Sequence, residues 1–251
     1  MDMSLRPFLA SLALLAAASG LRAEVVTVAS GPARVALIEL YTSEGCSSCP
    51  PADSWISSLR QTNGLWKSYV PIAFHVSYWD HLGWKDRFAS SDFTKRQYAY
   101  ADHWGANGVY TPCFVRNGME WRPSGRLPEA TTGAPGVLTV VADGSDTYRV
   151  SFVPARGLPS DLEAHVALLA GNLHSKVTAG ENDGSTLSHE FVVVTLKSTA
   201  LTTSTAAPRF EGVVHLETPS IEIAPRLALA AWISPAGSLE PLQATGGWLR
   251  R

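Results

Sequence analysis

Two cysteines separated by two residues stand between a nearly continuous apolar run and a pair of prolines, and this order constrains the fold more than any other feature. The run at residues 34–41, Arg-Val-Ala-Leu-Ile-Glu-Leu-Tyr, is typical of a central strand buried on both faces. Cys46 and Cys49 follow a polar turn, and the two prolines come directly after them. Because proline is tolerated in the first turn of a helix, a helix is predicted from this point to about Arg60.

The next 60 or so residues continue the alternation of strand and helix. A second mostly apolar strand is predicted over residues 69–76 and a helix over about 93–104. A third strand is predicted over residues 113–116, and the Asn117-Gly118 dipeptide, a strong hairpin signal, pairs it with residues 119–122. A strand followed by Cys-x-x-Cys at the start of a helix, in this β-α-β-α-ββ order, predicts a thioredoxin-like α/β domain.

The remainder of the chain has a different pattern. Residues 123–136 contain three prolines and three glycines, which favours a domain boundary. Beyond them, short apolar runs separated by turns predict an all-β, sandwich-like domain. These runs cover residues 137–142, 147–153, 163–169, 175–179, 186–197, 209–217 and 226–233. The predicted organisation is a signal peptide over 1–23, a thioredoxin-like domain over 24–135 and a β-sandwich-like domain over 136–251.

The N-terminus has the pattern of a secretory signal. Arg6 precedes an apolar run over residues 8–18, and small residues lead to Ala23, near which cleavage is expected. The run is shorter than the about 20 apolar residues that span a bilayer, and an uncleaved N-terminal anchor is the alternative. We therefore expect a periplasmic or secreted protein, in a compartment where disulfides persist.

The net charge of −2 comes without a basic stripe or an acidic tail. This composition does not indicate binding to nucleic acid, or to an anionic membrane beyond the signal segment. It leaves the oligomeric state undetermined. Partners have to be inferred from candidate sites instead.

Cys46 and Cys49 are the main candidates for chemistry. At a helix N-terminus the thiolate of Cys46 would be stabilised, with a pKa lowered from about 8.5 into the range of roughly 3.5 to 7.5, so Cys46 is the candidate nucleophile. Cys49, one turn on, would be the resolving thiol. A bond between cysteines so close together stabilises little through chain entropy. We predict thiol–disulfide exchange with protein or small-molecule thiols and disulfides, without a cofactor.

Thr111 and Pro112 complete this predicted centre. In thioredoxin-like folds a cis proline that opens the third strand faces the dithiol, so Pro112 would lie against Cys46. The backbone of Thr111 could then pair with an extended substrate.

Two alternatives to redox chemistry stay open. Cys46 and Cys49 supply only two metal ligands, but His75 and Cys113 could complete a site for copper(I) or zinc. The pair could also be an inert local disulfide on a protein-interaction module without catalytic turnover.

Three further residues have a structural and a functional interpretation each. His75, which ends the second strand, is either a hydrogen-bonded structural histidine or a proton-transfer group. Glu39 is either a proton acceptor for Cys49 or, as we favour, paired or exposed. Cys113 is more often a small buried hydrophobic residue than a third redox thiol.

Aromatic and acidic residues gather in the predicted loop after the second strand. Tyr78, Trp79 and Trp84 could form a substrate-binding lip over the dithiol, since binding residues are often mounted on loops. They could equally form a satellite hydrophobic cluster, with Asp80 or Asp86 capping the next helix.

Several blocks of the sequence resemble the DUF1223 family of exported proteins. The most specific block is Ile-Glu-Leu-Tyr-Thr-Ser-Glu-Gly-Cys-Ser-Ser-Cys-Pro-Pro-Ala-Asp. The blocks that carry the resemblance are residues 38–53, 75–84, 96–97, 109–112 and 180–189. The resemblance implies a thioredoxin-like domain followed by a β-rich domain, and no settled activity. Two departures are Cys113, where the resemblance implies an uncharged polar residue, and the broken stretch 123–136, where it implies a closing helix.

Overall fold

The fold, taken from a computed structural model, is described for residues 25–124, 128, 132–143, 146–155, 160–203, 208–217 and 226–249. The predicted signal peptide lies outside these ranges. Among the described residues, the longest helix falls short of what a membrane crossing requires in length and apolar character.

The described elements are mostly strands, with two α-helices and two short 3-10 helices. In chain order they are β1 (Val26–Ala29), β2 (Ala36–Thr42), α1 (Pro50–Ser58), η1 (Leu59–Gln61), β3 (Tyr69–His75), η2 (Asp80–Leu82), α2 (Ser91–Trp104), β4 (Cys113–Arg116), β5 (Met119–Trp121), β6 (Gly136–Ala142), β7 (Thr147–Pro154), β8 (Leu162–Gly171), β9 (Leu173–Lys176), β10 (Thr186–His189), β11 (Val192–Ala200), β12 (Thr202–Thr203), β13 (Phe210–His215), β14 (Arg226–Pro235) and β15 (Gln243–Leu249).

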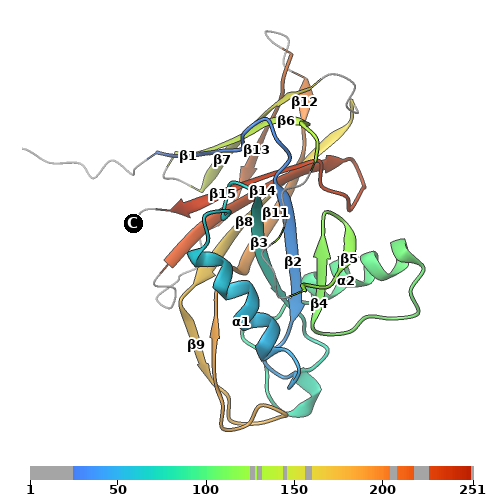
Figure 1. The fold of residues 1–251 in the computed structure, drawn as a ribbon, viewed down its shortest axis with the longest axis vertical. Helices are drawn as coiled ribbons and strands as arrows, with labels where there is room; N and C mark the ends of the chain where they lie inside the picture. Colours follow the sequence, from blue (N-terminus) through green and yellow to red (C-terminus); the bar gives the residue numbers. More distant parts are fainter. Residues whose placement is uncertain are drawn as a thin grey trace, which may run out of the picture.

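The strands form two large sheets and a small hairpin (Figure 1). One sheet has eight strands in the order β15-β14-β8-β11-β3-β2-β4-β5, and the other has five in the order β1-β6-β7-β13-β12. β9 and β10 pair with each other beside α1. Within the eight-stranded sheet β3 is parallel to both β2 and β11, whereas the remaining pairs are antiparallel.

The prediction of a thioredoxin-like α/β domain followed by an all-β, sandwich-like domain is wrong. Most of the regular structure is β-sheet, and the two large sheets give a β-sandwich-like fold. Strands from both sides of the predicted boundary between residues 135 and 136 share each large sheet. The two predicted domains merge because β11 pairs with the free edge of β3. This pairing begins where the Ala73 amide donates to the Phe191 carbonyl. The eight-stranded sheet therefore runs on from β3 into the later strands.

Alternation along β8 explains how this sheet is covered on both faces. Ala164, Val166 and Leu168 point into the core shared with β6, β7 and β13. Ala167 and Leu169 point into the core shared with β2, β3 and the helices. Because successive side chains of a strand point to opposite faces, an unbroken apolar stretch such as residues 166–170 of β8 belongs between two layers.

Several local predictions are confirmed. β2, α1, β3, α2, β4 and β5 lie within a few residues of their expected positions. α2 begins at an N-cap, where the Ser90 hydroxyl accepts from the Asp92 amide, and it ends at Gly105 in the left-handed conformation. Asn117 and Gly118 both have positive φ, as the predicted two-residue hairpin requires.

A buried ion pair fastens α2 to β2. The Arg96 guanidinium donates to both Glu39 carboxylate oxygens at 2.9 and 3.2 Å, and the Glu39 side chain is fully buried. The hydroxyls of Tyr41 and Tyr100 also donate to Glu39, at 3.0 and 2.5 Å. Glu39 is therefore paired, as we favoured.

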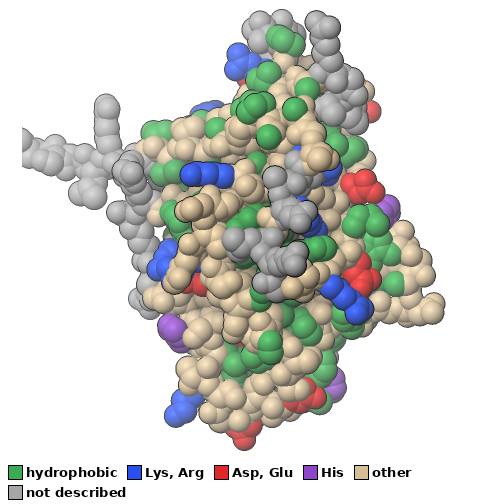
Figure 2. Space-filling view, in the orientation of Figure 1, with side chains coloured by type: hydrophobic (Ala, Val, Ile, Leu, Met, Phe, Trp, Pro, Cys, Tyr) green, Lys and Arg blue, Asp and Glu red, His purple; other side chains and the backbone are tan. Residues whose placement is uncertain are grey.

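On the face shown in Figure 2, Lys and Arg side chains lie scattered, with acidic side chains between them. A surface of this kind carries no extended area of one charge sign among the described residues of that face.

His165 on β8 gives a prediction for the pH dependence of stability. Its ring stacks on Trp232, and its two nitrogens lie 2.7 and 3.1 Å from the hydroxyls of Ser198 and Ser234. Burial, together with the charge of Arg96, lowers the pKa of His165 from 6.5 to about 3. A folded-state pKa below the unfolded value contributes stability above pH 6.5 that is lost as the pH falls toward 3.

We expect this histidine alone to account for a loss on the order of 4 kcal/mol in the free energy of unfolding between pH 7 and pH 3. Urea unfolding across this range should be measured for the wild type and for His165→Gln, in which the fall should be shallower. The exposed His215 on β13 supplies the matched control, His215→Gln. If the free energy of unfolding fell equally steeply with pH in all three proteins, the lowered pKa assigned to His165 would be contradicted.

Candidate functional site

The candidate site lies where the parallel strands β2 and β3 end. Cys46 and Cys49 form a disulfide in the loop between β2 and α1, and both residues are fully buried. Cys49 is the N-cap residue of α1, and its carbonyl accepts from the amides of Ala52 and Asp53. The sequence therefore positions the pair as predicted, at the start of a helix that follows a buried strand.

The segment before β4 borders the disulfide on one side. The Thr111–Pro112 peptide bond is cis, and the Thr111 carbonyl oxygen lies 3.9 Å from the Cys46 sulfur. The exposed Ser48 hydroxyl lies 3.2 Å from the same sulfur and 3.4 Å from the same carbonyl. Of the two sulfur atoms, that of Cys46 is therefore the one with a hydroxyl and a carbonyl oxygen beside it.

Residues 180–184, here named the covering turn, pack against the cysteine loop. The Asn182 side-chain amide donates to the carbonyls of Glu44 and Cys46 at 2.9 and 3.0 Å. The Glu181 carboxylate accepts from both the amide and the hydroxyl of Ser47, at 2.9 and 2.7 Å. Four hydrogen bonds therefore hold the covering turn against the cysteine loop.

The aromatic loop after β3 packs around this loop as well. The indole N–H of Trp79 donates to the Thr111 hydroxyl at 2.7 Å, and that of Trp84 donates to the Glu44 carboxylate at 2.8 Å. The Tyr78 hydroxyl donates to Gln97. Trp79 and Trp84 are therefore tied to the site by their polar ends, and their role in binding a substrate stays a prediction.

A buried network of acids and histidines lies beneath the cysteine loop. The His75 Nδ1–H donates to Asp86 at 2.7 Å, and the same carboxylate oxygen accepts from the Glu44 amide at 2.9 Å. Although burial acts to raise it, the interaction with His75 holds the pKa of Asp86 below its ordinary value. Hydrogen bonds from His189 and Trp84 likewise outweigh burial and lower the pKa of Glu44.

His189, the last residue of β10, lies between the carboxylates of Glu44 and Asp53. Its Nε2–H donates to Glu44 at 3.2 Å, and its Nδ1 lies 3.8 Å from an Asp53 carboxylate oxygen. Burial acts to lower the pKa of His189, but Asp53 and Glu44 together raise it to about 9. The His75 and His189 rings meet edge to face, with centroids 4.9 Å apart.

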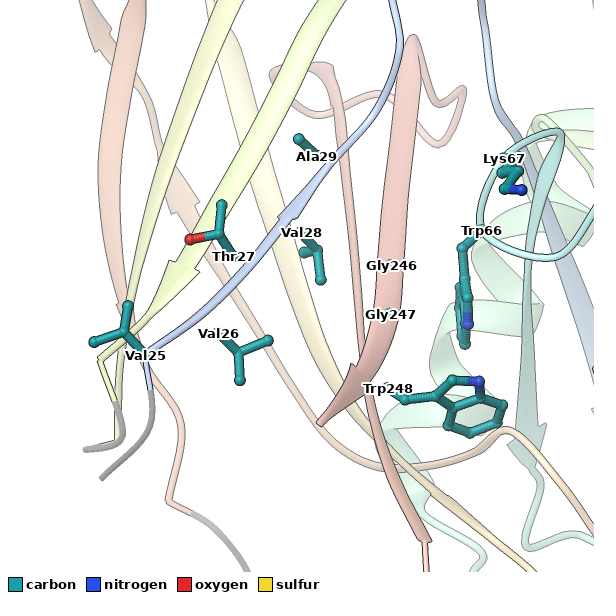
Figure 3. A pocket seen from close by; sticks show the side chains of 10 residues that line it. All are labelled: Val25, Val26, Thr27, Val28, Ala29, Trp66, Lys67, Gly246, Gly247 and Trp248. Atoms are coloured by element: carbon teal, nitrogen blue, oxygen red, sulfur yellow. The ribbon is translucent and has the colours of Figure 1, made fainter. Parts of the chain in front are cut away.

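Two clefts open beside this network, between α1 and the β9–β10 hairpin. The smaller, of about 170 Å³, is lined by Pro50, Asp53, Ser54, Thr186, Leu187, Ser188 and His189. The larger, of about 300 Å³, shares Ser54, Ser188 and His189 with it. A third cleft of about 570 Å³ lies between β1, β15 and the Trp66 loop (Figure 3), where Lys67 is the titratable residue of the lining. Titratable groups therefore concentrate at the two clefts beside α1.

The alternative metal-ligand set is not brought together. Cys46 and Cys49 are bonded to each other, and among the described residues the group that places ligand atoms close together contains His75 without a cysteine. Cys113 is buried at the start of β4, where burial raises the pKa of its thiol to about 11. Glu39 contacts Arg96 and two tyrosines, as described above, and not the disulfide.

Sequence reasoning missed Glu44, Asp53, Asn182 and His189 as site residues. Glu44 and Asp53 lie inside the first block that resembles the DUF1223 family, and Asn182 and His189 lie inside the last. The polar residues inside these blocks were the sequence signal that could have identified them as site residues. Their meeting depends on the β9–β10 hairpin reaching α1, which no short-range pattern reveals.

Comparisons with known proteins agree with this placement of the family blocks. The profile described as "Protein of unknown function (DUF1223)" matches residues 37–233. A crystal structure of protein AGR_C_4864 from Agrobacterium tumefaciens is similar at a TM-score of 0.56 and 23% identity, over 86% of this chain and 94% of that one. HBP35 of Porphyromonas gingivalis is similar at a TM-score of 0.57 and 14% identity, over 86% and 76%. No curated protein matches the sequence. At these identities the two solved structures show a shared fold.

Proposed function

The chain belongs to the DUF1223 family of proteins of unknown function, and from the disulfide at the start of α1 we propose that it is a thiol–disulfide oxidoreductase. The observation that carries the proposal is the position of Cys46 between the helix start and the Thr111 carbonyl. A disulfide that closes so small a loop contributes little to stability through chain entropy, and the polar atoms beside the Cys46 sulfur favour a chemical role for it.

The proposed reaction begins with the disulfide form. A thiolate of the partner attacks the Cys46 sulfur, the bond between the two cysteines breaks, and Cys49 leaves as a thiolate that takes up a proton. A second thiolate of the partner then attacks the partner's own sulfur in the mixed disulfide, and Cys46 leaves as a thiolate that takes up a proton. The partner ends as a disulfide and the protein as a dithiol, so that two electrons and two protons have moved, and the reverse sequence reduces a partner disulfide.

The partner has to be admitted by the covering turn. Cys46 is fully buried, and Asn182 and Glu181 hold the loop around it by hydrogen bonds to the Cys46 carbonyl and to Ser47, so in this proposal an attacking thiol reaches the sulfur when the covering turn and the cysteine loop separate. Gly180 and Gly184 both have positive φ, and they bracket the segment that has to move. We propose protein or small-molecule thiols and disulfides as partners, in the periplasm or outside the cell, where such exchange is sustained.

The reduction potential of the Cys46–Cys49 couple tests the proposal. The protein is equilibrated in glutathione buffers of graded potential, its free thiols are trapped with an alkylating agent, and the alkylated forms are counted by mass. We expect a reversible couple above about −250 mV, in the range of working exchange centres. A couple below about −300 mV, or a bond that glutathione does not reduce, would mark a structural disulfide and end the proposal.

A further inference from the structure

Asp53, His75 and His189 meet under the cysteine loop in a way that their hydrogen bonds do not explain. One ligand atom of each, a carboxylate oxygen or a ring nitrogen, lies within 4.8 Å of the other two. The three residues come from α1, β3 and β10, and all are buried. We propose that these three side chains bind a divalent transition-metal ion of the zinc class, at a site separate from the disulfide.

Two unpartnered nitrogens point to a missing ligand. His75 Nε2 and His189 Nδ1 are buried and have no hydrogen-bond partner among the described residues. An ion pair between protonated His189 and Asp53 would not resolve this, because their 3.8 Å separation exceeds a hydrogen bond and His75 would still be unpaired. Buried polar atoms of native proteins nearly always have a partner, and a metal ion would serve both nitrogens at once.

Each proposed ligand is already held by a partner on its far side. Asp86 accepts from the other nitrogen of His75, and Glu44 accepts from the other nitrogen of His189. The Thr42 hydroxyl donates to the second oxygen of Asp53 at 2.8 Å. Carboxylates that fix the tautomer and orientation of a histidine are the usual outer partners of metal-binding histidines.

The spacing and the donor atoms suit zinc. Ligands at about 2.1 Å from a zinc ion lie about 3.4 Å apart in a tetrahedral arrangement, so the three atoms have to close by roughly 1 Å. Two imidazoles and one carboxylate form a set that binds zinc, and three protein ligands leave a fourth position for water or a bound molecule. Asp53 and His189 line the cleft of about 170 Å³, which gives the ion and water a way in.

The test is a metal titration of the oxidised protein, in which both thiols are tied up in the disulfide. After removal of metals with a chelator, we expect one Zn²⁺ per chain by calorimetry and elemental analysis. Co²⁺ should give the visible absorption of a tetrahedral ion without a thiolate band. No binding of either ion, or a thiolate band, would overturn the proposal.

Variants identify the ligands. Asp53→Asn and His189→Gln should each weaken Zn²⁺ binding about a hundredfold or more, and Asp86→Asn by about 10 to 100-fold, since it removes only an outer partner. His174→Gln, in the neighbouring cleft, should bind as the wild type does. Circular dichroism checks that each variant is folded. Full Zn²⁺ binding by folded Asp53→Asn and His189→Gln would overturn the proposal.

This proposal does not depend on the redox function. The double variant Cys46→Ser, Cys49→Ser should lose exchange and retain Zn²⁺. Loss of Zn²⁺ binding from this variant in its folded form would instead assign the metal to the cysteines and sink the site proposed above.

Discussion

Replacing Cys46 by serine is expected to lower the rate of exchange with a model disulfide by about a thousandfold or more. The thiolate is the nucleophile in exchange, and a serine hydroxyl cannot form a disulfide at all. The remaining Cys49 is the buried N-cap residue of α1, whereas the Ser48 hydroxyl and the Thr111 carbonyl lie beside the Cys46 sulfur, so we do not expect Cys49 to substitute for Cys46. The measurement is the initial rate with the reduced protein and a chromogenic aromatic disulfide at neutral pH.

Two companion variants make this result specific. Cys49→Ser should react once at Cys46 and stop as a stable mixed disulfide that mass spectrometry detects, because the resolving thiol is gone. Cys113→Ser should exchange at a rate within about twofold of wild type, since a buried thiol with a raised pKa contributes little thiolate. An unchanged rate in Cys46→Ser, or a mixed disulfide trapped at Cys49 instead, would contradict the assignment of roles.

The second large effect concerns stability, through the ion pair of Arg96 with Glu39. Arg96→Met should lower the free energy of unfolding by about 3 to 5 kcal/mol, because it leaves the fully buried Glu39 carboxylate without its cation. Arg96 also lies over the rings of Phe74, Tyr100 and Trp232, with its guanidinium carbon 5.4 to 5.5 Å from their centroids. Urea unfolding monitored by tryptophan fluorescence measures the loss.

The neighbouring residue on α2 is a matched control for this change. Lys95 pairs with Asp92 in a bridge whose two side chains are 76% and 78% exposed, so Lys95→Met should change stability by no more than about 1 kcal/mol. The double variant Glu39→Gln, Arg96→Met should be more stable than Arg96→Met alone, since the unpaired charge is removed. Equal losses for the Lys95 and Arg96 variants would refute the role of the buried pair.

Local sequence patterns were enough to predict most strands and helices in the first half of the chain. The buried run of β2, the proline-marked start of α1 and the Asn117-Gly118 hairpin are set by residues close together in sequence, and each was predicted in place. The disulfide partners were identified for the same reason. The Glu39 pairing also followed from a simple rule, that a charge inside an apolar strand has to be compensated.

The arrangement of sheets could not be predicted from these patterns. A fully buried strand such as β3 accepts a neighbour on either edge, and nothing local says which strand will pair with it. Residues 186–197 were expected to form one strand, yet Phe191 has a φ of 60° and divides them into β10 and β11. That turn sends β10 toward α1 and β11 to the edge of β3, and it is held by the packing of Phe191 against Trp66 and Trp248. Both the fold error and the missed His189 have this one origin.

The covering turn has a consequence for the newborn chain. Asn182 is 136 residues beyond Cys46, and a ribosome adding about 5 to 20 residues per second needs roughly 7 to 27 seconds to make that stretch. For this interval the two cysteines have no cover, and any oxidant that meets the growing polypeptide can join them. The disulfide can therefore form on an unfinished chain, before the hydrogen bonds between the covering turn and the cysteine loop exist.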